Sequence, residues 1–519
     1  MEANLHIKLS DGYDIGDLDD ILANEFAYVR STPVGESWIF YDTFDWLLFS
    51  KSLTLHQSGG MLLLRRLPEG ETAQKLTSSS IPVFASDLPD SPLKDQLVGI
   101  IHPRALLNLA EINIKSHTYR ILNANQKTVA RLVFTEAHTP DEAGVTPIST
   151  YLSLLPVRGY PKYARQLGEF IKQQGEPTSV WEDVYQVALA AAGETPGSYT
   201  SKLDLYLDPD MRSEQATKII LRRLLEVMKA NEPGLRADID TEFLHDFRVS
   251  IRRTRSALGQ IKGVFPADVV ARFKGEFAYL GKSTNKLRDL DVYLLAEDSY
   301  RAMLSEGLRD DISPLFDHLG AQREGALGEV IEVLDSDRYA QILHDWDDFL
   351  TEPVRDEIAG GNAALPIIET ARKRIYKRYR RVIKDGNAVL ENPQDELMHA
   401  LRIECKKLRY LIEFFASLFP PKKVARLVDQ LKKLQDNLGE FNDLSVQQEY
   451  LLNIVEELPI HEPGTRRALV ATGYLIDNLA HRQQVVRDDF AETFTTFASQ
   501  NNQGLFRKLY AYKEKRPGS

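Results

Sequence analysis

The chain has 519 residues, 43% of them apolar and 27% charged, and a formal net charge of −11. This length allows two or three domains, and the composition is an ordinary soluble one. A single cysteine, Cys405, excludes an intrachain disulfide framework and is typical of a reducing compartment. Because we find neither a secretory leader pattern nor a run of 18 apolar residues, we expect a cytoplasmic protein without membrane contact.

Residues 1–175 are predicted to form an α+β domain with an antiparallel, hairpin-rich sheet. Ser58-Gly59-Gly60 joins two strand-like runs, and residues 123–127 join two more, which is the signature of hairpins. Strands are expected at 4–9, 38–41, 52–57, 61–67, 111–122, 128–137 and 148–157, and helices at 17–25 and 163–174.

Residues 176–204 are predicted to hold one helix, at 181–192, and a Gly/Pro/Ser linker. From there to residue 510 the pattern is of long amphipathic helices. Helix breaks are expected at 231–234, 263–266, 360–361, 419–421 and 462–464, where Gly, Pro and Asn cluster.

A stripe of cations marks the segment 244–258. His245, Arg248, Arg252 and Arg255 are three, seven and ten residues apart, so they share one face of a helix, at about 100° per residue. Apolar residues flank the stripe, so the helix can bury one side while the cations stay accessible.

The stripe recurs 154 residues later, and the offset extends beyond one helix. Residues 287–292 map onto 441–446, and the segment from Met211 maps onto the one from Leu365. We therefore expect a tandem duplication, with copies at about 205–358 and 359–510, that forms two four-helix bundles related by a pseudo-twofold axis. The second stripe is His399, Arg402, Lys406 and Arg409, with Cys405 on its apolar side as a core residue.

Charge is segregated along this duplicated part. Residues 366–410 hold twelve Lys/Arg and six acids, whereas residues 296–365 hold seventeen acids and five arginines. A local positive potential therefore exists despite the acidic total. The helices before the two stripes contribute Lys218, Arg222 and Arg223 in the first copy, and Arg372, Lys373, Arg374, Lys377, Arg378, Arg380, Arg381 and Lys384 in the second.

Many similar cations in one groove suit a polymer of repeating phosphates, because arginine binds phosphate with two bonds and lysine adds mobile charge. A solvated charged face is the ordinary explanation of one basic helix, but a histidine at the same place and cations at matching positions in both copies favour a binding site. At the groove's edge, Lys282, Lys286 and Arg288 are equally well explained as surface charge. The predicted site comprises His245, Arg248, Arg252, Arg253, Arg255, His399, Arg402, Lys406, Lys407, Arg409, Lys218, Arg222, Arg223, Arg372, Lys373, Lys377, Arg380, Arg381, Lys282 and Lys286.

The segments 240–255 and 398–410 resemble the conserved histidine α-helical domain, CHAD, over roughly residues 205–510. The resemblance implies an all-helical fold of two four-helix bundles with a basic surface that binds inorganic polyphosphate, and no catalytic reaction. It also implies a cytoplasmic protein that could associate with polyphosphate granules. No cofactor and no protein partner follow from it.

The N-terminal part resembles a CYTH, or triphosphate tunnel, domain through the segment 40–47, and the stretch 196–203 is similar to the junction in CYTH–CHAD fusions. That family opens with Glu-x-Glu-x-Lys, whose carboxylates hold a divalent metal. The matching residues here are Asn4, His6 and Lys8, so we expect neither a metal site nor triphosphate hydrolysis. Other family positions hold Thr54, His56, Ser149, Tyr151 and Ser153, and Lys8, Arg65, Arg66, Arg120 and Arg131 remain as cations that could bind an anion.

Two rival functions belong to other classes. A metal-dependent triphosphatase would need carboxylates from elsewhere, such as Glu111 or Glu136. A nucleic-acid binder would use the same basic helices, but no clear aromatic platform is interleaved with the stripes. A metal-binding role for His245 and His399 is disfavoured because cationic neighbours at three and seven residues would repel a metal ion.

Overall fold

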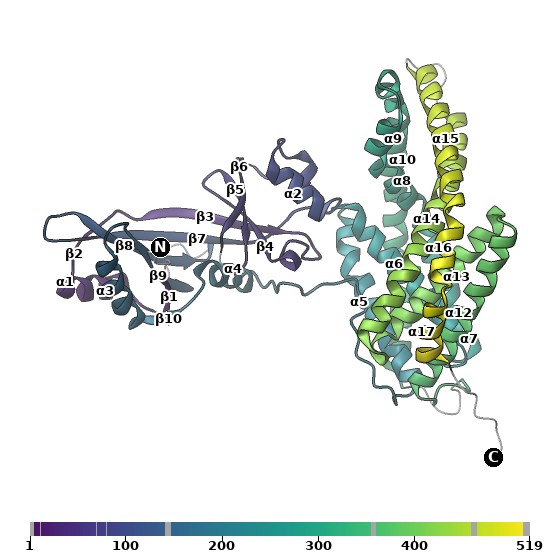
Figure 1. The fold of residues 1–519 in the computed structure, drawn as a ribbon, viewed down its shortest axis with the longest axis horizontal. Helices are drawn as coiled ribbons and strands as arrows, with labels where there is room; N and C mark the ends of the chain where they lie inside the picture. The colour runs from purple at the N-terminus through teal and green to yellow at the C-terminus, as the bar shows by residue number, and fades with distance from the viewer. Residues whose placement is uncertain are drawn as a thin grey trace. The chain divides into compact units, whose positions relative to one another are not determined.

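The computed structural model describes residues 5–10, 12–68, 70–78, 80–140, 147–353, 360–457 and 464–511. The chain divides into two compact units, residues 1–201 and 202–519 (Figure 1). The first unit is built on an antiparallel sheet and the second is helical, so the predicted combination of an α+β domain and an all-α domain is confirmed.

The first unit contains a ten-stranded sheet in the order β10-β1-β9-β8-β7-β3-β4-β5-β6, with β2 paired to β7. Every strand pair in it is antiparallel, and consecutive strands joined by short turns, such as β4–β5 and β7–β8, form the predicted hairpins. The strands are β1 Leu5–Leu9, β2 Ala27–Arg30, β3 Val34–Asp42, β4 Leu53–Ser58, β5 Met61–Arg66, β6 Thr72–Thr77, β7 Leu107–Leu122, β8 Thr128–His138, β9 Ser149–Pro156 and β10 Gly175–Pro177.

Helices cover both faces of this sheet. Tyr119 and Ile121 of β7 pack with α1 and α3, whereas Ile112 and Ile114 of the same strand pack with α4. Odd and even positions of a strand point to opposite faces, so one strand serves two cores. The helices are α1 Ile15–Glu25, α2 Pro92–Ile101, α3 Pro161–Lys172 and α4 Val180–Ala191.

The sequence pattern found the long elements of this unit and missed the short ones. The predicted helices at 17–25, 163–174 and 181–192 are confirmed as α1, α3 and α4, and all seven predicted strands are present. β2, β6, β10 and α2 were not predicted, because three to six residues at a sheet margin carry too little periodicity and α2 follows a Ser/Pro-rich passage.

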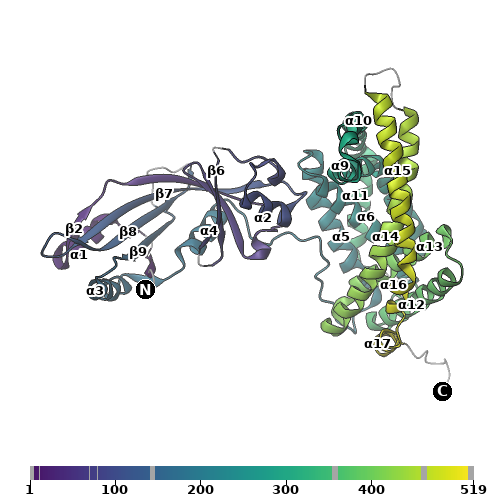
Figure 2. The same cartoon turned by 45° about the horizontal axis from the view of Figure 1, so that its top comes forward.

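The duplication is visible in the helix bounds of the second unit. Moving α6 by 154 residues gives 395–414, which are the bounds of α13, and moving α5 gives 367–390, one residue short of α12. The segment α7–α8 corresponds to the single helix α14, which lies beside α15 in Figures 1 and 2. The helices are α5 Ser213–Arg236, α6 Thr241–Gln260, α7 Ala267–Ser283, α8 Asn285–Leu295, α9 Glu297–Met303, α10 Ser313–Leu334, α11 Asp337–Thr351, α12 Ile367–Glu391, α13 Asp395–Phe414, α14 Pro421–Glu457, α15 Thr465–Asp488, α16 Phe490–Phe497 and α17 Gln500–Tyr510.

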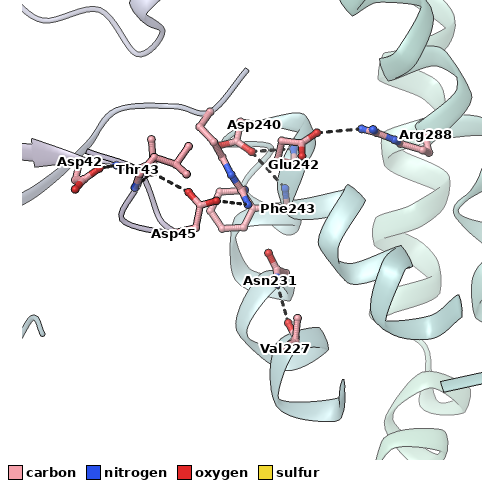
Figure 3. Close-up of polar contacts among 11 residues, drawn as sticks. Asp42, Thr43, Asp45, Val227, Asn231, Asp240, Glu242, Phe243 and Arg288 are labelled. Carbon is pink, nitrogen blue, oxygen red and sulfur yellow. Dashed lines mark hydrogen bonds and ion pairs between the residues drawn. The ribbon is translucent and has the colours of Figure 1, made fainter. Parts of the chain in front are cut away.

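One predicted break, at 231–234, is wrong. Helix α5 continues through Pro233 to Arg236. Gly234 is there for packing instead, since a Cβ on it would lie 2.3 Å from the ring of Phe243. The chain turns at residues 237–240, and the carboxylate of Asp240 accepts hydrogen bonds from the first backbone N–H groups of α6 (Figure 3).

The breaks predicted at 263–266 and 419–421 are confirmed between α6 and α7 and before α14, and 360–361 lies between α11 and α12. Of the last predicted break, residues 462 and 463 lie outside the described residues, and Gly464 precedes α15. Among the described helices, we find none that is both long enough and apolar enough to cross a membrane.

Candidate anion-binding site

The two stripe helices, α6 and α13, pack against each other, so the duplicated motifs meet where the two copies join. The Arg252 Nε donates to the Tyr410 hydroxyl at 2.7 Å, and Arg253 forms an ion pair with Glu413 at 3.1 Å. The Gln260 amide donates to the backbone carbonyl of Lys407 at 3.2 Å. Cations that are far apart in the sequence are therefore brought together.

Arg248 is committed to contacts within the protein. Its guanidinium donates to the Gly281 carbonyl at 2.9 Å, the Thr284 hydroxyl at 2.6 Å and the Asn285 side chain at 2.8 Å. Burial lowers the pKa of Arg248 to about 10. The side chain therefore fastens α6 to the junction of α7 and α8.

The matching residues of the second copy bind α14. Arg402 forms an ion pair with Asp443 at 3.0 Å, and the His399 Nδ1 lies 2.5 Å from the Asn442 side-chain oxygen. Arg409 donates to Glu413 at 2.6 Å. Arg248 and Arg402 therefore both have internal acceptors on the helices that follow their stripes, although the acceptor residues are at different positions in the two copies.

Lys406 lies close to cations of both stripes. Burial, together with the positive charges of Arg402 and Arg252, lowers the pKa of Lys406 to about 8, while Asp443 acts in the opposite direction. Two cations and one acid around a third, half-buried cation make this the point of the stripes that would gain most from an added anion.

The most open cationic feature is a cavity of about 900 Å³ between α12, α13 and the end of α6, which we call the α12 cavity. Among the described residues that line it are eight Lys or Arg and one acid, Glu404. Four of the cations lie exposed along one face of α12, at spacings of four, three and four residues: Lys373, Lys377, Arg380 and Lys384. The full lining is Gln260, Lys262, Lys373, Arg374, Tyr376, Lys377, Arg378, Arg380, Arg381, Lys384, Glu404 and Leu411.

The single acid of the cavity lining is paired with two cations of the protein. Glu404 accepts from Arg378 and, at 2.8 Å, from Lys407. Burial acts to raise the pKa of Glu404, but these hydrogen bonds hold it below its usual range. The carboxylate stays charged, and the remaining cations give the cavity a strong positive excess.

The first-copy cations of the predicted site point elsewhere. Lys218 is buried, contacts the Glu352 carbonyl and lies 4.8 Å from the centre of the Phe349 ring, while Arg222 donates to the Leu350 carbonyl at 2.7 Å. These are the last carbonyls of α11, which have no partner inside their own helix. Arg223 pairs with Glu226 at 3.2 Å.

The three cations predicted at the groove's edge differ in placement. Arg288 contacts the Thr241 carbonyl at 3.3 Å and Glu242 at 3.6 Å (Figure 3), and Lys286 pairs with Glu329 at 2.9 Å. Arg288 therefore joins α8 to α6, and Lys286 joins α8 to α10. Lys282 is exposed. None of the three appears in the described lining of the α12 cavity.

Of the residues predicted from the sequence, the cavity brings together Lys373, Lys377, Arg380 and Arg381, with Lys407 at Glu404. The predicted set omitted Arg374, Arg378, Lys384, Lys262 and Tyr376. The first three were visible as cations of the same helix, at 100° steps that place them on the cavity face. Lys262 follows the end of α6 and had no signal, because only folding brings it to α12, where its carbonyl accepts from Arg374 at 2.6 Å.

In the first unit, Lys8 forms an ion pair within the protein. Its ammonium lies 3.0 Å from Asp183, which also accepts from the Tyr151 hydroxyl at 2.6 Å. His6 contacts the Ser153 hydroxyl at 2.8 Å. Asn4, the other matching position of the opening motif, lies outside the described residues.

Aromatic side chains pack around His56 in the first unit. Its ring centre lies 4.5 Å from Trp181 and 5.5 Å from Trp38. Burial lowers the pKa of His56 to about 3, helped by the charge of Arg65, so the ring is neutral. Arg65 itself lies 4.4 Å from the centre of the Trp181 ring.

The motif segment 40–47 is structural here. The buried carboxylate of Asp42 accepts from the backbone N–H group of Thr43 at 2.7 Å (Figure 3). It also accepts from the backbone N–H groups of Leu48 and Phe49, both at 2.9 Å. Glu111, one of the alternative metal ligands, accepts from Ser37 at 2.8 Å. A search of the described ranges finds no group of three or more His, Cys, Asp or Glu residues able to hold a metal ion.

Comparison with known proteins gives three kinds of finding. Residues 219–452 match the model of the CHAD domain. Two uncharacterized proteins of Mycobacterium tuberculosis, from strains CDC 1551 and H37Rv, are each 22% identical over 410 residues, covering 75% of this chain and 75% of theirs.

Three solved structures are similar. The CHAD domain from the plant Ricinus communis is 24% identical, with a TM-score of 0.46 over 55% of this chain and 94% of that one. PptA from Streptomyces chartreusis is 17% identical, with a TM-score of 0.42 over 55% and 100%. HpAC1 from Hippeastrum, whose structure is described as revealing a dominant triphosphatase activity, is 17% identical, with a TM-score of 0.27 over 38% and 100%.

Proposed function

Because residues 219–452 of this chain form a CHAD domain, we propose that the protein binds inorganic polyphosphate through the helical unit. The observation that carries the proposal is the α12 cavity, whose described lining holds eight cations and a single, internally neutralised acid. Polyphosphate repeats one anionic group along a flexible chain. A row of similar cations along a helix matches that chemistry better than a single shaped pocket does.

Two parts of the surface have different roles in this proposal. The exposed cations of α12 contact phosphate directly, as point charges and bidentate forks. At the crossing of α6 and α13, Arg252 and Lys406 add positive potential, while Arg248 and Arg402 hold the helices in place. The predicted binding residues therefore divide into ligand contacts and positioning residues.

The test is a binding titration of the full chain with long-chain polyphosphate. The double variant Arg380→Glu/Lys384→Glu should lose about tenfold or more in affinity, because each reversal turns an attraction into a repulsion. The control is Lys127→Glu/Lys162→Glu, which makes the same charge change at exposed positions of the first unit. Equal losses from the two double variants would contradict the proposed site.

A nucleic-acid ligand is the second candidate, because Tyr376 lines the cationic cavity and an aromatic ring can stack on a base. Competition at matched salt separates the two ligands. If single-stranded DNA displaces polyphosphate, and Tyr376→Leu weakens the binding of DNA but not of polyphosphate, the cavity binds nucleic acid through stacking on its bases. Polyphosphate that resists displacement supports the phosphate polymer.

For the first unit we propose a non-catalytic role. In the family resemblance, Lys8 belongs to the motif that faces triphosphate, but here Lys8 forms an ion pair with Asp183, which also accepts from the Tyr151 hydroxyl. Aromatic packing around His56 occupies the sheet face on which a polyanion would need cations. These contacts favour a scaffold rather than a triphosphatase.

A further inference from the structure

The two copies of the duplication differ in the charge of the helices that precede the stripes, α5 and α12. Their bounds correspond at the 154-residue offset, so each residue of α12 from Ile367 to Leu390 has a counterpart in α5. The four exposed cations spaced along the cavity face of α12 can therefore be compared position by position. Lys373, Lys377, Arg380 and Lys384 correspond to Ile219, Arg223, Glu226 and Ala230.

The flank of the same face differs even more. Arg374, Arg378 and Arg381 line the cavity in the second copy. Their counterparts in the first copy are Ile220, Leu224 and Val227, and all three are buried in the core. The surface that holds seven cations in α12 holds one cation in α5, and that cation pairs with Glu226.

The cations that α5 does carry are used by the fold. Lys218 and Arg222 take up the last carbonyls of α11, at Glu352 and Leu350. A helix C-terminus carries partial negative charge, so the end of α11 binds these two cationic side chains as an anion would. In the second copy, Arg372 and Tyr376 stand at the positions of Lys218 and Arg222, and Phe506, at the position of Glu352, stacks on Tyr379 with its ring centre 3.8 Å away.

We propose that the polyanion site is one-sided: phosphate is held by the second copy, with Lys262 from the end of α6, while the equivalent face of the first copy has lost its cations and has its flank buried in the core. This inference rests on the proposed function. It adds how many polyphosphate sites each chain has and which of the two copies forms the site. A short polyphosphate should bind once to each chain, despite the internal duplication.

The duplication supplies a matched pair of variants for the test. Lys377→Glu and Arg223→Glu make the same charge change at corresponding positions of the full chain. Titration calorimetry with tripolyphosphate should show that Lys377→Glu weakens binding by about tenfold and Arg223→Glu by less than about threefold. The wild-type chain should bind one tripolyphosphate.

Thermal unfolding followed by circular dichroism shows whether each variant is folded, and Lys373→Gln is a milder second variant of the cavity. Two equivalent sites in the wild type, or equal losses from Lys377→Glu and Arg223→Glu, would refute one-sidedness while leaving polyphosphate binding in place. A wild-type chain that binds neither tripolyphosphate nor long-chain polyphosphate would overturn the proposed function as well.

Discussion

Single residues of the same type have opposite tasks in this protein. Arg248 is enclosed by three acceptors of the α7–α8 junction, whereas Arg380 is exposed in the lining of the α12 cavity. In the sequence both are arginines on a basic helix. Which of them can bind a ligand depends on whether the fold supplies its hydrogen-bond acceptors.

Replacing Arg248 should therefore affect stability before binding. We expect Arg248→Met to lower the free energy of unfolding by about 2–3 kcal/mol, because it leaves acceptors of a charged donor without their partner. Urea unfolding of the full chain, followed by circular dichroism, measures this. Arg255→Met, at an exposed position of the same stripe, should change stability by less than about 0.5 kcal/mol. A similar small effect at both positions would show that Arg248 is not structural.

Lys406 should make stability depend on pH. Its pKa is about 8 in the folded protein and 10.5 ordinarily, so between these values the unfolded chain binds more protons. Stability should therefore rise with pH in that window, and Lys406→Met should lack this rise. Polyphosphate favours the charged form, so affinity should fall over the same window in the wild type and less in the variant. Identical pH profiles of the two proteins would contradict this role.

At the scale of elements, close helix packing fixes the α12 cavity. A Cβ on Gly386 of α12 would lie 1.9 Å from the ring of Phe494 in α16, so the two helices approach only because this residue is glycine. The face of α12 opposite the cavity is thereby held against the core. The cations of the cavity face depend on this packing for their position.

Gly386→Ala should therefore destabilise the protein by about 1–3 kcal/mol, because overpacking outweighs the gain in helix propensity. Gly473→Ala, in α15, is the matched control: a Cβ there meets no atom within 4 Å. That variant should be neutral or more stable by up to about 1 kcal/mol. Thermal unfolding of the two variants measures the difference. Equal shifts in melting temperature would mean that α16 moves easily to make room for the added methyl group.

At the scale of the whole molecule, a chain of net charge −11 binds a polyanion only if its charges are segregated. We expect polyphosphate affinity to fall steeply as salt rises, since each neutralised phosphate releases condensed counterions, as it does in nucleic acids. The slope of log affinity against log salt should be shallower for Arg380→Glu/Lys384→Glu. A salt-independent affinity would exclude an electrostatic groove.

The full chain should release no phosphate from triphosphate with magnesium, manganese or zinc, because Lys8 is paired with Asp183 and a metal needs carboxylate ligands. Phosphate release is measured for the wild type and for Lys8→Ala. Turnover that Lys8→Ala abolishes would make the first unit an enzyme.

The sequence by itself determined the two fold classes, the long helices and strands, the duplication and the cationic character of α12, because these follow from local periodicity and composition. Cys405 was also predicted correctly as a buried core residue. The tertiary structure alone decided which cations are exposed. Lys218 and Arg222 meet carbonyls 128 or more residues away, and Lys262 reaches α12 over a similar separation. Such contacts are set by packing between distant segments, and one-dimensional spacing carries no information about them.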